Sequence, residues 1–376
     1  IHIEPLDKEA VIRFRIDGIL HEAMRYPILL HEKIIFRVKI MAHMQTDEHA
    51  AAQDGRFEYH GKDNMFDVRV SILPVTDGEN VVMRLLDSNT HRYSLETLGL
   101  GVSDHKKIQA AIEKPHGMIL AVGPTGSGKT TILYTVLMKL NSREVNIMTI
   151  EDPVEYGIEG VQQTQVNPKK DLTFSTGLRS IVRQDPDIIM VGEIRDEETA
   201  DIAVNSALTG HLVISTLHTN DAATTFPRLT EMNVEPFLIA SSVNLIIALR
   251  LVRKICEHCK ESYIPTHHEL ELLQLGDTVT QFMQKISGNN DIETLRLYRG
   301  KGCKACRNSG FSERVGIFEI LEVNEEIRLL IIKKSSAEVI NEKAIELGMT
   351  SLLYDGIVKA LNGTTTLDEV MKVARV

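Results

Sequence analysis

The sequence predicts an α/β fold built around a mostly parallel sheet with helices on both faces. Between about residues 104 and 252, short apolar runs typical of strands alternate with patterns of helical period. One of these strands runs directly into a glycine-rich loop and a further helical pattern. The stretches on either side follow different patterns, so the 376 residues are expected to form about two to three domains.

Residues 1–90 are predicted to form a small α+β domain. The segment "VIRFRIDGIL" (11–20) alternates apolar and polar residues and turns at Asp17-Gly18, as a strand that enters a hairpin does. Residues 30–44 have helical spacing, and residues 55–75 indicate two further strands.

Residues 104–252 are predicted to form the α/β core, after a polar, glycine-containing linker at residues 91–103. Helical patterns separate the apolar runs, which favours parallel strands joined by crossover helices. The predicted strands are "GMILAVG", "NIMTIED", "DIIMVGE" and "HLVISTLH".

The C-terminal third of the sequence is predicted to contain two different regions. Residues 253–323 contain only short strand and helix patterns, many loop residues and the four cysteines, and they are predicted to form a separate metal-binding module. Residues 324–376 are predicted to be helical, because two stretches with apolar residues at three-to-four spacing each stop at a glycine.

Composition limits the classes of protein that fit. Apolar residues make up 43% of the chain and charged residues 25%, which is typical of a globular protein. The net charge of −10 disfavours a dedicated nucleic-acid binder, although a basic patch can still be local. The sequence has no apolar run of 18 residues and no signal-peptide pattern, and it starts in strand-like sequence without Met, so a fragment of a longer protein is expected.

The segment "GPTGSGKTT" predicts a nucleoside triphosphate site. It matches G-x-x-x-x-G-K-[ST], follows the apolar strand "MILAV" and precedes a helical pattern. Backbone N–H groups of such a loop bind phosphate oxygens, Lys129 reaches the β- and γ-phosphates, and the Thr130 hydroxyl binds Mg²⁺. The alternative is a chance glycine turn. The predicted nucleotide-binding residues are Gly123, Pro124, Thr125, Gly126, Ser127, Gly128, Lys129, Thr130 and Thr131.

ATP is the favoured nucleotide. A guanine-specifying Asn-Lys-x-Asp motif is absent from the sequence. The nearest segment, "NPKKD" at 167–171, has its lysine one place too late.

Three polar clusters follow predicted strands: "TIEDPVE" (149–155), "MVGEIRD" (190–196) and "STLHTND" (215–221). Ligands of open α/β sheets bind at the carboxyl ends of the strands, so we expect all three clusters beside the phosphate loop. Glu193 directly follows its strand and is placed to polarise an attacking water, although Gly192 stands where related enzymes often have a Mg²⁺-binding Asp. The alternative for each of these acids is a solvated loop residue.

The first cluster adds Glu151, Asp152 and Glu155 to the same edge. In the third cluster, His218 is expected at the carboxyl end of its strand and is the better candidate for sensing the γ-phosphate. His211 lies seven residues earlier and is as well explained by a structural role.

Four cysteines form two C-x-x-C pairs, Cys256/Cys259 and Cys303/Cys306. Two such pairs can supply four thiolates in a tetrahedron, the usual structural Zn²⁺ site. The 43 intervening residues exceed the spacing of a compact zinc ribbon, so two disulfides or free thiols are the alternatives.

These motifs, in this order, resemble those of the secretion ATPases, the hexameric motors of type II secretion and type IV pilus assembly. "GPTGSGKTT" resembles their Walker A motif, "TIEDPVE" their Asp box, "LRSIVRQDPDIIMVGEIRD" their Walker B segment and "GHLVISTLHTNDA" their His box. The segments "IRFRIDG", "QDGR", "DVRVSILP" and "GMTSLLYDGIVKALNGTTTLDEV" are similar too, so the resemblance covers essentially the whole chain. It implies a RecA-like P-loop ATPase core after a PAS-like N-terminal domain.

The resemblance implies roles for individual residues. Glu193 would be the catalytic base, assisted by Glu155 around the metal and water, with His218 beside them. Arg56 and Arg69 of the N-terminal domain would reach the nucleotide as arginine fingers do. Three further arginines would belong to the nucleotide or subunit-interface network: Arg179, Arg183 and Arg195.

The resemblance also implies the setting. The chain would be a homo-hexamer at the cytoplasmic face of the inner membrane, held there through an inner-membrane platform protein and another membrane partner that faces the cytoplasm. It would use ATP, Mg²⁺ and a structural Zn²⁺, and no nucleic acid is expected. The alternatives are a nucleic-acid-translocating or conjugation-type traffic ATPase, and a regulatory nucleotide switch.

Two departures from the family pattern bear on contacts between subunits. The stretch "TDEHAAAQDGR" has fewer arginines than expected, and Asn80 stands where arginine is common.

Overall fold

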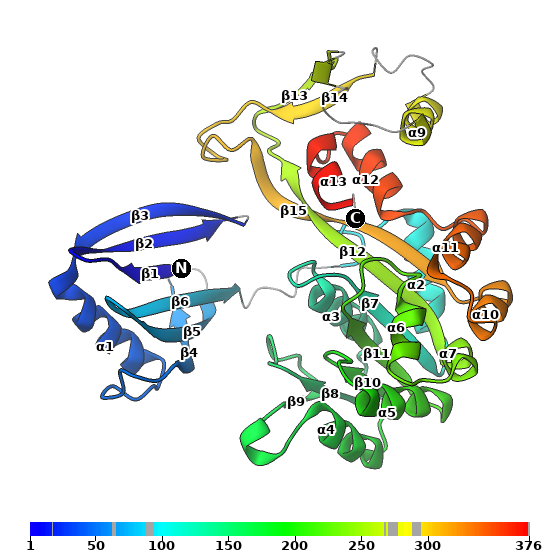
Figure 1. Cartoon of the computed structure of the whole chain (residues 1–376), viewed down its shortest axis with the longest axis horizontal. Coiled ribbons are helices and arrows are strands. Elements are labelled where there is room, and N and C mark those ends of the chain that lie inside the picture. The colour runs from blue at the N-terminus through cyan, green and yellow to red at the C-terminus, as the bar shows by residue number, and fades with distance from the viewer. Residues whose placement is uncertain are drawn as a thin grey trace. The chain divides into compact units, whose positions relative to one another are not determined.

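The computed structural model describes residues 1–16, 18–61, 65–87, 94–266, 268–269, 277–287 and 295–374. The chain separates into two compact units, Ile1–Arg92 and Tyr93–Val376, and Figure 1 shows the elements of each. Among the described residues, no helix is both long and apolar enough to cross a membrane.

The first unit is an antiparallel sheet with one helix on one face. Within its described residues, six strands pair in the order β3-β2-β1-β6-β5-β4, and a short 3₁₀ turn, Ile28–Leu30, leads into helix α1, His31–Met41. Ile35 and Val38 of α1 are buried against Val68, Val70 and Ile72 of the sheet. The strands are β1 (His2–Pro5), β2 (Glu9–Ile16), β3 (Ile19–Pro27), β4 (Gln53–His60), β5 (Met65–Val75) and β6 (Gly78–Asp87).

This arrangement confirms the predicted α+β character. Strands β2 and β3 pair antiparallel up to Ile16 and Ile19, where the hairpin was expected, although Asp17 lies outside the described residues. Likewise β4 and β5 pair up to His60 and Met65, while residues 62–64 between them lie outside the described residues.

The second unit is built on a mostly parallel sheet, as predicted. In the described part of the chain its seven strands follow the order β15-β12-β7-β11-β10-β8-β9. All neighbouring pairs are parallel except β12 with β15. The strands are β7 (Gly117–Val122), β8 (Ile147–Glu151), β9 (Val161–Gln165), β10 (Ile188–Val191), β11 (Leu212–Leu217), β12 (Val243–Ile255) and β15 (Phe311–Glu322).

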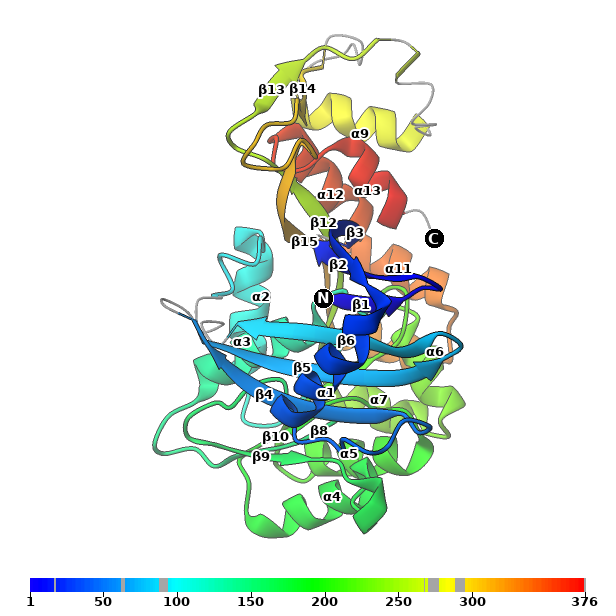
Figure 2. The same ribbon diagram turned by 90° about the vertical axis from the view of Figure 1, so that its left-hand side faces the viewer.

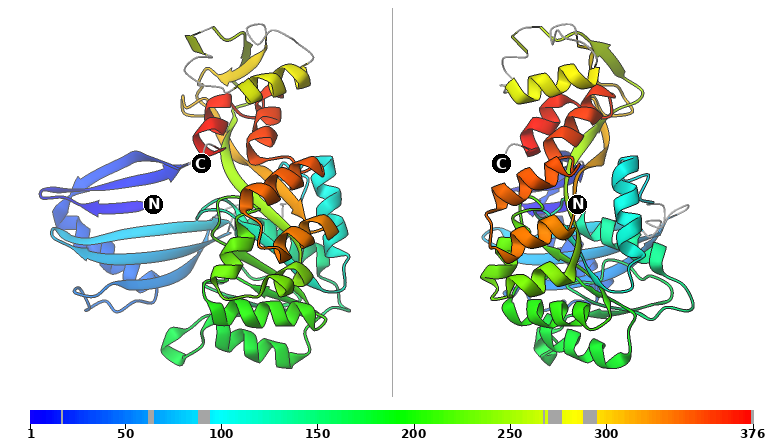
Figure 3. Two further views of the ribbon diagram at one scale, coloured as in Figure 1. Left: turned by 45° about the vertical axis from the view of Figure 1, so that its right-hand side comes forward. Right: turned by 90° about the vertical axis from the view of Figure 1, so that its right-hand side faces the viewer.

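Helices cover both faces of this sheet. In β7, Leu120 packs with one helical layer, while its neighbours Ile119 and Ala121 pack with the other. Figure 2 shows α2 on one side of the β12–β15 ribbon and α11 on the other, and the same two helices are cyan and orange in Figure 3. One layer contains α2 (Val102–Ile112) and α3 (Lys129–Leu140); the other contains α4 (Phe174–Ile181), α5 (Glu197–Leu208), α6 (Thr225–Glu231), α7 (Pro236–Ser242), α10 (Glu325–Ile332) and α11 (Ala337–Glu346).

The cysteine-bearing region is inserted between two strands of the core sheet. Residues 253–323 were expected to form one module, but β15 lies within them and pairs with β12 along almost its whole length. A separate hydrophobic cluster joins the inserted region to the last two helices. The elements of this part are β13 (Lys260–Tyr263), α9 (Asp277–Ser287), β14 (Leu297–Gly300), α12 (Leu352–Leu361) and α13 (Leu367–Ala374).

An ion pair fastens α13 to the end of β12. Arg253 donates two hydrogen bonds to the Glu369 carboxylate, from Nε at 2.8 Å and from Nη2 at 2.6 Å. The Arg253 guanidinium also lies 4.1 Å from the centre of the Phe311 ring of β15. Burial opposes ionisation of Glu369, but Arg253 and Lys372 outweigh it and lower the pKa of this carboxyl from 4.5 to about 2.

We therefore expect Glu369→Gln to lower the free energy of unfolding near pH 7 by about 2–3 kcal/mol. The pKa is lowered by folding, so the stabilisation is present above pH 4.5 and is lost as the pH falls toward 2. Urea unfolding at several pH values measures it, with Glu346→Gln at an exposed ion pair as the control. A Glu369→Gln variant whose stability falls with acid as steeply as the parent's would contradict this assignment.

Candidate functional site

The predicted nucleotide residues lie at one edge of the parallel sheet. Strands β7, β11, β10 and β8 are hydrogen-bonded in parallel register, so their carboxyl ends face the same way. The phosphate loop follows β7, His218 follows β11, Glu193 follows β10 within two residues, and Asp152 follows β8. The common edge is thus a direct result of the strand order.

The phosphate loop has the backbone of a phosphate cradle. Gly123, Gly126 and Gly128 have φ angles of 151°, 78° and 99°, which other residues rarely adopt. A Cβ on Gly123 would lie 2.7 Å from the Leu249 carbonyl oxygen, so this glycine is also required by space. Helix α3 begins at Lys129, which places Thr130 and Thr131 in its first turn beside free backbone N–H groups.

Lys129 lies folded over this loop. Its Nζ donates to the carbonyl oxygens of Gly123 at 2.7 Å and Pro124 at 3.1 Å. Burial lowers the pKa of Lys129, nearby Arg250 lowers it further, and Glu193 opposes both. The buried Ser127 Oγ has no hydrogen-bond partner among the described residues. A buried hydroxyl without a partner, aligned amides and a lysine suit the phosphates of a nucleotide.

Glu193 lies in a charged cluster beside the loop. Its carboxylate forms an ion pair with Arg195 and lies 3.4 Å from the Nε2 atom of His218. The Glu193 side chain is 13% exposed, and its hydrogen bond raises the pKa of Arg195. Asp152 adds negative potential at Arg195, so the clusters after β8, β10 and β11 meet here.

The structure gives a steric reason for Gly192. A Cβ at this position would lie 3.3 Å from both the Ile150 carbonyl oxygen and the Glu151 Cα of β8. The Gly192 N–H donates to the same Ile150 oxygen at 2.8 Å, which holds the two backbones together. Any larger residue here, aspartate included, would require the adjacent β8 backbone to shift slightly.

Glu151 and Glu155 occupy different environments although both were expected at the nucleotide edge. Glu151 is 2% exposed, and its carboxylate accepts hydrogen bonds from Tyr134, Thr149 and Gln163. Glu155 is partly exposed and lies in the loop between β8 and β9. Of the two, Glu155 is the more exposed.

Arg179 and Arg183 do not share a helix. Arg179 is on α4 and forms an ion pair with Glu198 of α5 at 2.7 Å. Arg183 lies beyond the end of α4, in the 3₁₀ turn Val182–Gln184, and its Nη2 donates to Ser180 Oγ at 3.4 Å. Both are exposed side chains on the surface of the second unit.

In the first unit, Arg56 and Arg69 are cross-strand neighbours. The register pairs Arg56 of β4 with Arg69 of β5, and Arg69 with Arg84 of β6. Val68 and Val70 are buried under α1, so Arg69 between them lies on the opposite face of the sheet. Arg56 and Arg69 were predicted from the sequence, but Arg84 was not, because only the register of β5 and β6 shows that it lies beside Arg69.

Two buried charged residues that were not predicted from the sequence bind the loop between β11 and α6, residues 218–224, which we call the His-box loop. Arg250 of β12 is 6% exposed and donates from Nη2 to the Asn220 carbonyl oxygen at 2.9 Å. Glu319 of β15 is 4% exposed and accepts from the Ala222 N–H at 2.9 Å; burial raises the pKa of its carboxyl. A lone charge inside an apolar strand is the signal that marks Arg250 in the sequence.

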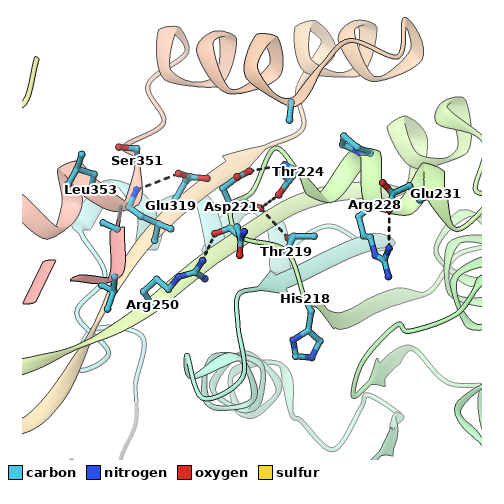
Figure 4. Close-up of a pocket in the computed structure, with 16 residues that line it drawn as sticks. His218, Thr219, Asp221, Thr224, Arg228, Glu231, Arg250, Glu319, Ser351 and Leu353 are labelled. Atoms are coloured by element: carbon cyan, nitrogen blue, oxygen red, sulfur yellow. Dashed lines mark hydrogen bonds and ion pairs between the residues drawn. The ribbon is translucent and has the colours of Figure 1, made fainter. Parts of the chain in front are cut away.

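Both residues line a cavity of about 680 Å³ between the His-box loop and the C-terminal helices. Figure 4 shows Asp221, Thr224 and Glu319 on its walls, with the His218 ring directed away from Asp221 and Glu319. His211 lies at the other end of β11, where its Nδ1 is 2.9 Å from the Ser206 carbonyl oxygen, which fits a structural role.

The four cysteines form one compact cluster. Their sulfur atoms all lie within 4.8 Å of one another, with Cys256–Cys303 at 3.9 Å, Cys259–Cys306 at 3.8 Å and Cys303–Cys306 at 3.6 Å. Four thiolates at about 2.3 Å from one Zn²⁺ would be about 3.8 Å apart. The backbone N–H groups of Cys303 and Gly310 donate to the Cys306 sulfur, as donors to a thiolate do.

Strand pairing explains why the long spacing does not separate the two cysteine pairs. Cys256 follows directly after β12, and β15 begins five residues after Cys306. The pairing of Ile255 with Phe311, together with the antiparallel pairing of β13 with β14, brings the pairs together. None of the four cysteines forms a disulfide in the structure.

Comparison with known proteins places these features in a family. The sequence matches the type II/IV secretion system protein family over residues 1–372. It is 46% identical over 375 residues to the type II secretion system ATPase E of Vibrio cholerae, covering 100% of this chain and 72% of that protein. It is 44% identical over 372 residues to the type IV pilus assembly ATPase PilB of Myxococcus xanthus, covering 99% of this chain and 64% of that protein.

Solved structures share the fold. The ATPase DotB of Legionella pneumophila superposes with a TM-score of 0.69 at 20% identity, over 99% of this chain and 90% of DotB. The pilus retraction motor PilT with bound ADP gives a TM-score of 0.66 at 23% identity, over 100% of this chain and 93% of PilT. The whole-chain sequence match, together with the identity to these relatives, establishes that this chain belongs to the type II/IV secretion system protein family.

Proposed function

We propose that the chain is a motor ATPase that hydrolyses MgATP to drive assembly of pilin or pseudopilin fibres at the bacterial inner membrane. The observation that carries this proposal is the shared sheet edge, where the phosphate loop, Glu193 and His218 lie together. The names of its relatives, which include both secretion and pilus-assembly ATPases, support this cellular role.

The chain's residues divide the work of hydrolysis. The loop amides and Lys129 would bind the phosphates, and the Thr130 hydroxyl, with Glu155 assisting, would hold a Mg²⁺ whose charge would offset that of the phosphates. Mg²⁺ usually keeps several water ligands, so binding it would not require an aspartate at position 192, where this chain has glycine. Glu193 orients the attacking water and accepts its proton, and His218 and Arg195 fix the Glu193 carboxylate.

Arginines complete the proposed site. Arg56 and Arg69 share one face of the first unit's sheet and would supply positive charge to the nucleotide. Arg179 and Arg183 are exposed, which suits contacts between subunits of a homo-hexamer. This ring would act at the cytoplasmic face of the inner membrane, on a platform protein and another membrane partner facing the cytoplasm.

The rival function is translocation of nucleic acid. ATPase rates measured with single-stranded DNA, and separately with the cytoplasmic domain of a membrane platform protein, distinguish the two. We expect stimulation by the platform domain and none by DNA, because the chain carries a net charge of −10. Stimulation by DNA alone would favour the rival function.

We expect Glu193→Gln to bind MgATP but to lower kcat by about 100-fold or more, because the amide cannot accept the water's proton. Phosphate release measures turnover, and a fluorescent ATP analogue measures binding. Glu197→Gln, in the exposed first turn of α5, is the matched control and should keep its activity. Loss of nucleotide binding in Glu193→Gln, with turnover per bound nucleotide intact, would refute the assignment.

We propose further that the cysteine cluster holds one structural Zn²⁺, because four thiolates leave no open position for catalysis. Natively purified protein is expected to contain one Zn²⁺ per chain by elemental analysis. Cys303→Ser should lower the metal content and the thermal midpoint, while Glu193→Gln should retain the metal. Protein without zinc but with unchanged stability would rule the site out.

A further inference from the structure

Tyr134 of α3 forms the centre of a buried polar network that the proposed reaction does not use. The side chain is fully buried in the hydrophobic cluster beneath α2 and α3. Its hydroxyl donates to Oε2 of Glu151, and burial together with this carboxylate raises the pKa of the phenol. Tyr134 therefore remains protonated and acts as a fixed donor.

The same hydroxyl reaches the loop that carries Glu155. It accepts a hydrogen bond from the Glu155 backbone N–H at 3.2 Å and another from Gln163 Nε2 at 3.3 Å. The Gln163 amide nitrogen has two hydrogens and is also within hydrogen-bond distance of Glu151 and the Tyr156 carbonyl oxygen, so its contact with Tyr134 is shared. The main contacts of the Tyr134 hydroxyl are therefore the bond to Glu151 and the bond from the Glu155 N–H.

Gln163 of β9 holds the same loop at two further points. Its Oε1 accepts from the Ile158 N–H at 2.7 Å, and its Nε2 donates to the Tyr156 carbonyl oxygen at 3.1 Å. The Tyr156 ring meets the Tyr134 ring edge-on, with centres 4.6 Å apart. The segment from Glu155 to Ile158 is thus tied to α3 and β9 at several points.

Helix α3 connects this loop to the phosphate loop. Lys129 begins the helix, and Tyr134 lies about 7.5 Å from it along the axis, at about 1.5 Å per residue. Because a helix is stiff over this length, Tyr134 sets the distance between Glu155 and the phosphate-binding residues. Catalytic groups need this kind of placement, since an error of about 1 Å can cost about 100-fold in rate.

We propose that Tyr134 is a positioning residue for ATP hydrolysis, whose hydroxyl holds Glu155 at a fixed place relative to Lys129 and Thr130. This inference rests on the proposed role of Glu155 beside Mg²⁺ and the attacking water. Tyr134 is fully buried, so it would act through Glu155 and not by contact with the nucleotide.

The test is a double-mutant cycle on the full chain. Tyr134→Phe keeps the ring and removes the hydroxyl, so kcat is expected to fall by about tenfold and the Mg²⁺ concentration for half-maximal rate to rise. Glu155→Gln should lower kcat further, and the double variant should be no slower than Glu155→Gln alone. Steady-state phosphate release across a Mg²⁺ titration gives both quantities.

Thr149→Val is the matched control. Thr149 also donates a hydroxyl hydrogen bond to the buried Glu151 carboxylate, at 2.5 Å, but no hydrogen bond joins its side chain to the segment from Glu155 to Ile158 in the described part of the chain. Both variants therefore remove one donor from the same carboxylate, and thermal melts show whether the loss of stability is comparable. Thr149→Val is expected to keep its kcat and its Mg²⁺ dependence.

Two results would overturn the inference. They differ in whether the proposed role of Glu155 is also refuted. If Tyr134→Phe behaves as Thr149→Val does while Glu155→Gln is impaired, Tyr134 has only a structural role and the proposed function stands. If Glu155→Gln turns over at the parent rate, the proposed role of Glu155 falls as well.

Discussion

The site depends on one constraint, the parallel register of β7, β11, β10 and β8. Side chains that are far apart in the sequence come together only because these strands end at the same edge. Helices cover both faces and bury nearly every residue of these strands, so a shift of register would disrupt the packing against both helical layers. The hydrophobic core thus determines the geometry of a polar site to which it contributes no charged group.

Local pattern was enough to predict much of this arrangement. The alternation of strands and helices gave the fold class, and the position of each polar cluster after a strand gave the shared edge. The pairing of β15 with β12 could not be predicted in this way, because 55 residues separate Ile255 from Phe311 and no local signal identifies a distant partner. For the same reason Arg84 was missed, since only strand register aligns it with Arg69.

Buried polar side chains decide the remaining details of the site. Arg250 and Glu319 hold the His-box loop from strands outside the nucleotide edge, and Tyr134 holds the loop of Glu155 from within the core. Such groups are costly to bury unless each is hydrogen-bonded. Glu151 follows the same pattern as the other acids in the sequence, and only its tertiary contacts with Tyr134, Thr149 and Gln163 show that it is buried.

The ribbon of β12 and β15 also has an evolutionary consequence. The chain leaves the core at Ile255 and returns at Phe311, two residues that are paired neighbours, so a short hairpin turn would close the same ribbon. The cysteine module can therefore be gained or lost without altering the core sheet. Its apolar residues pack on α12 and α13, however, so these helices must adapt whenever the module changes. The insertion and the two C-terminal helices therefore form one packing unit.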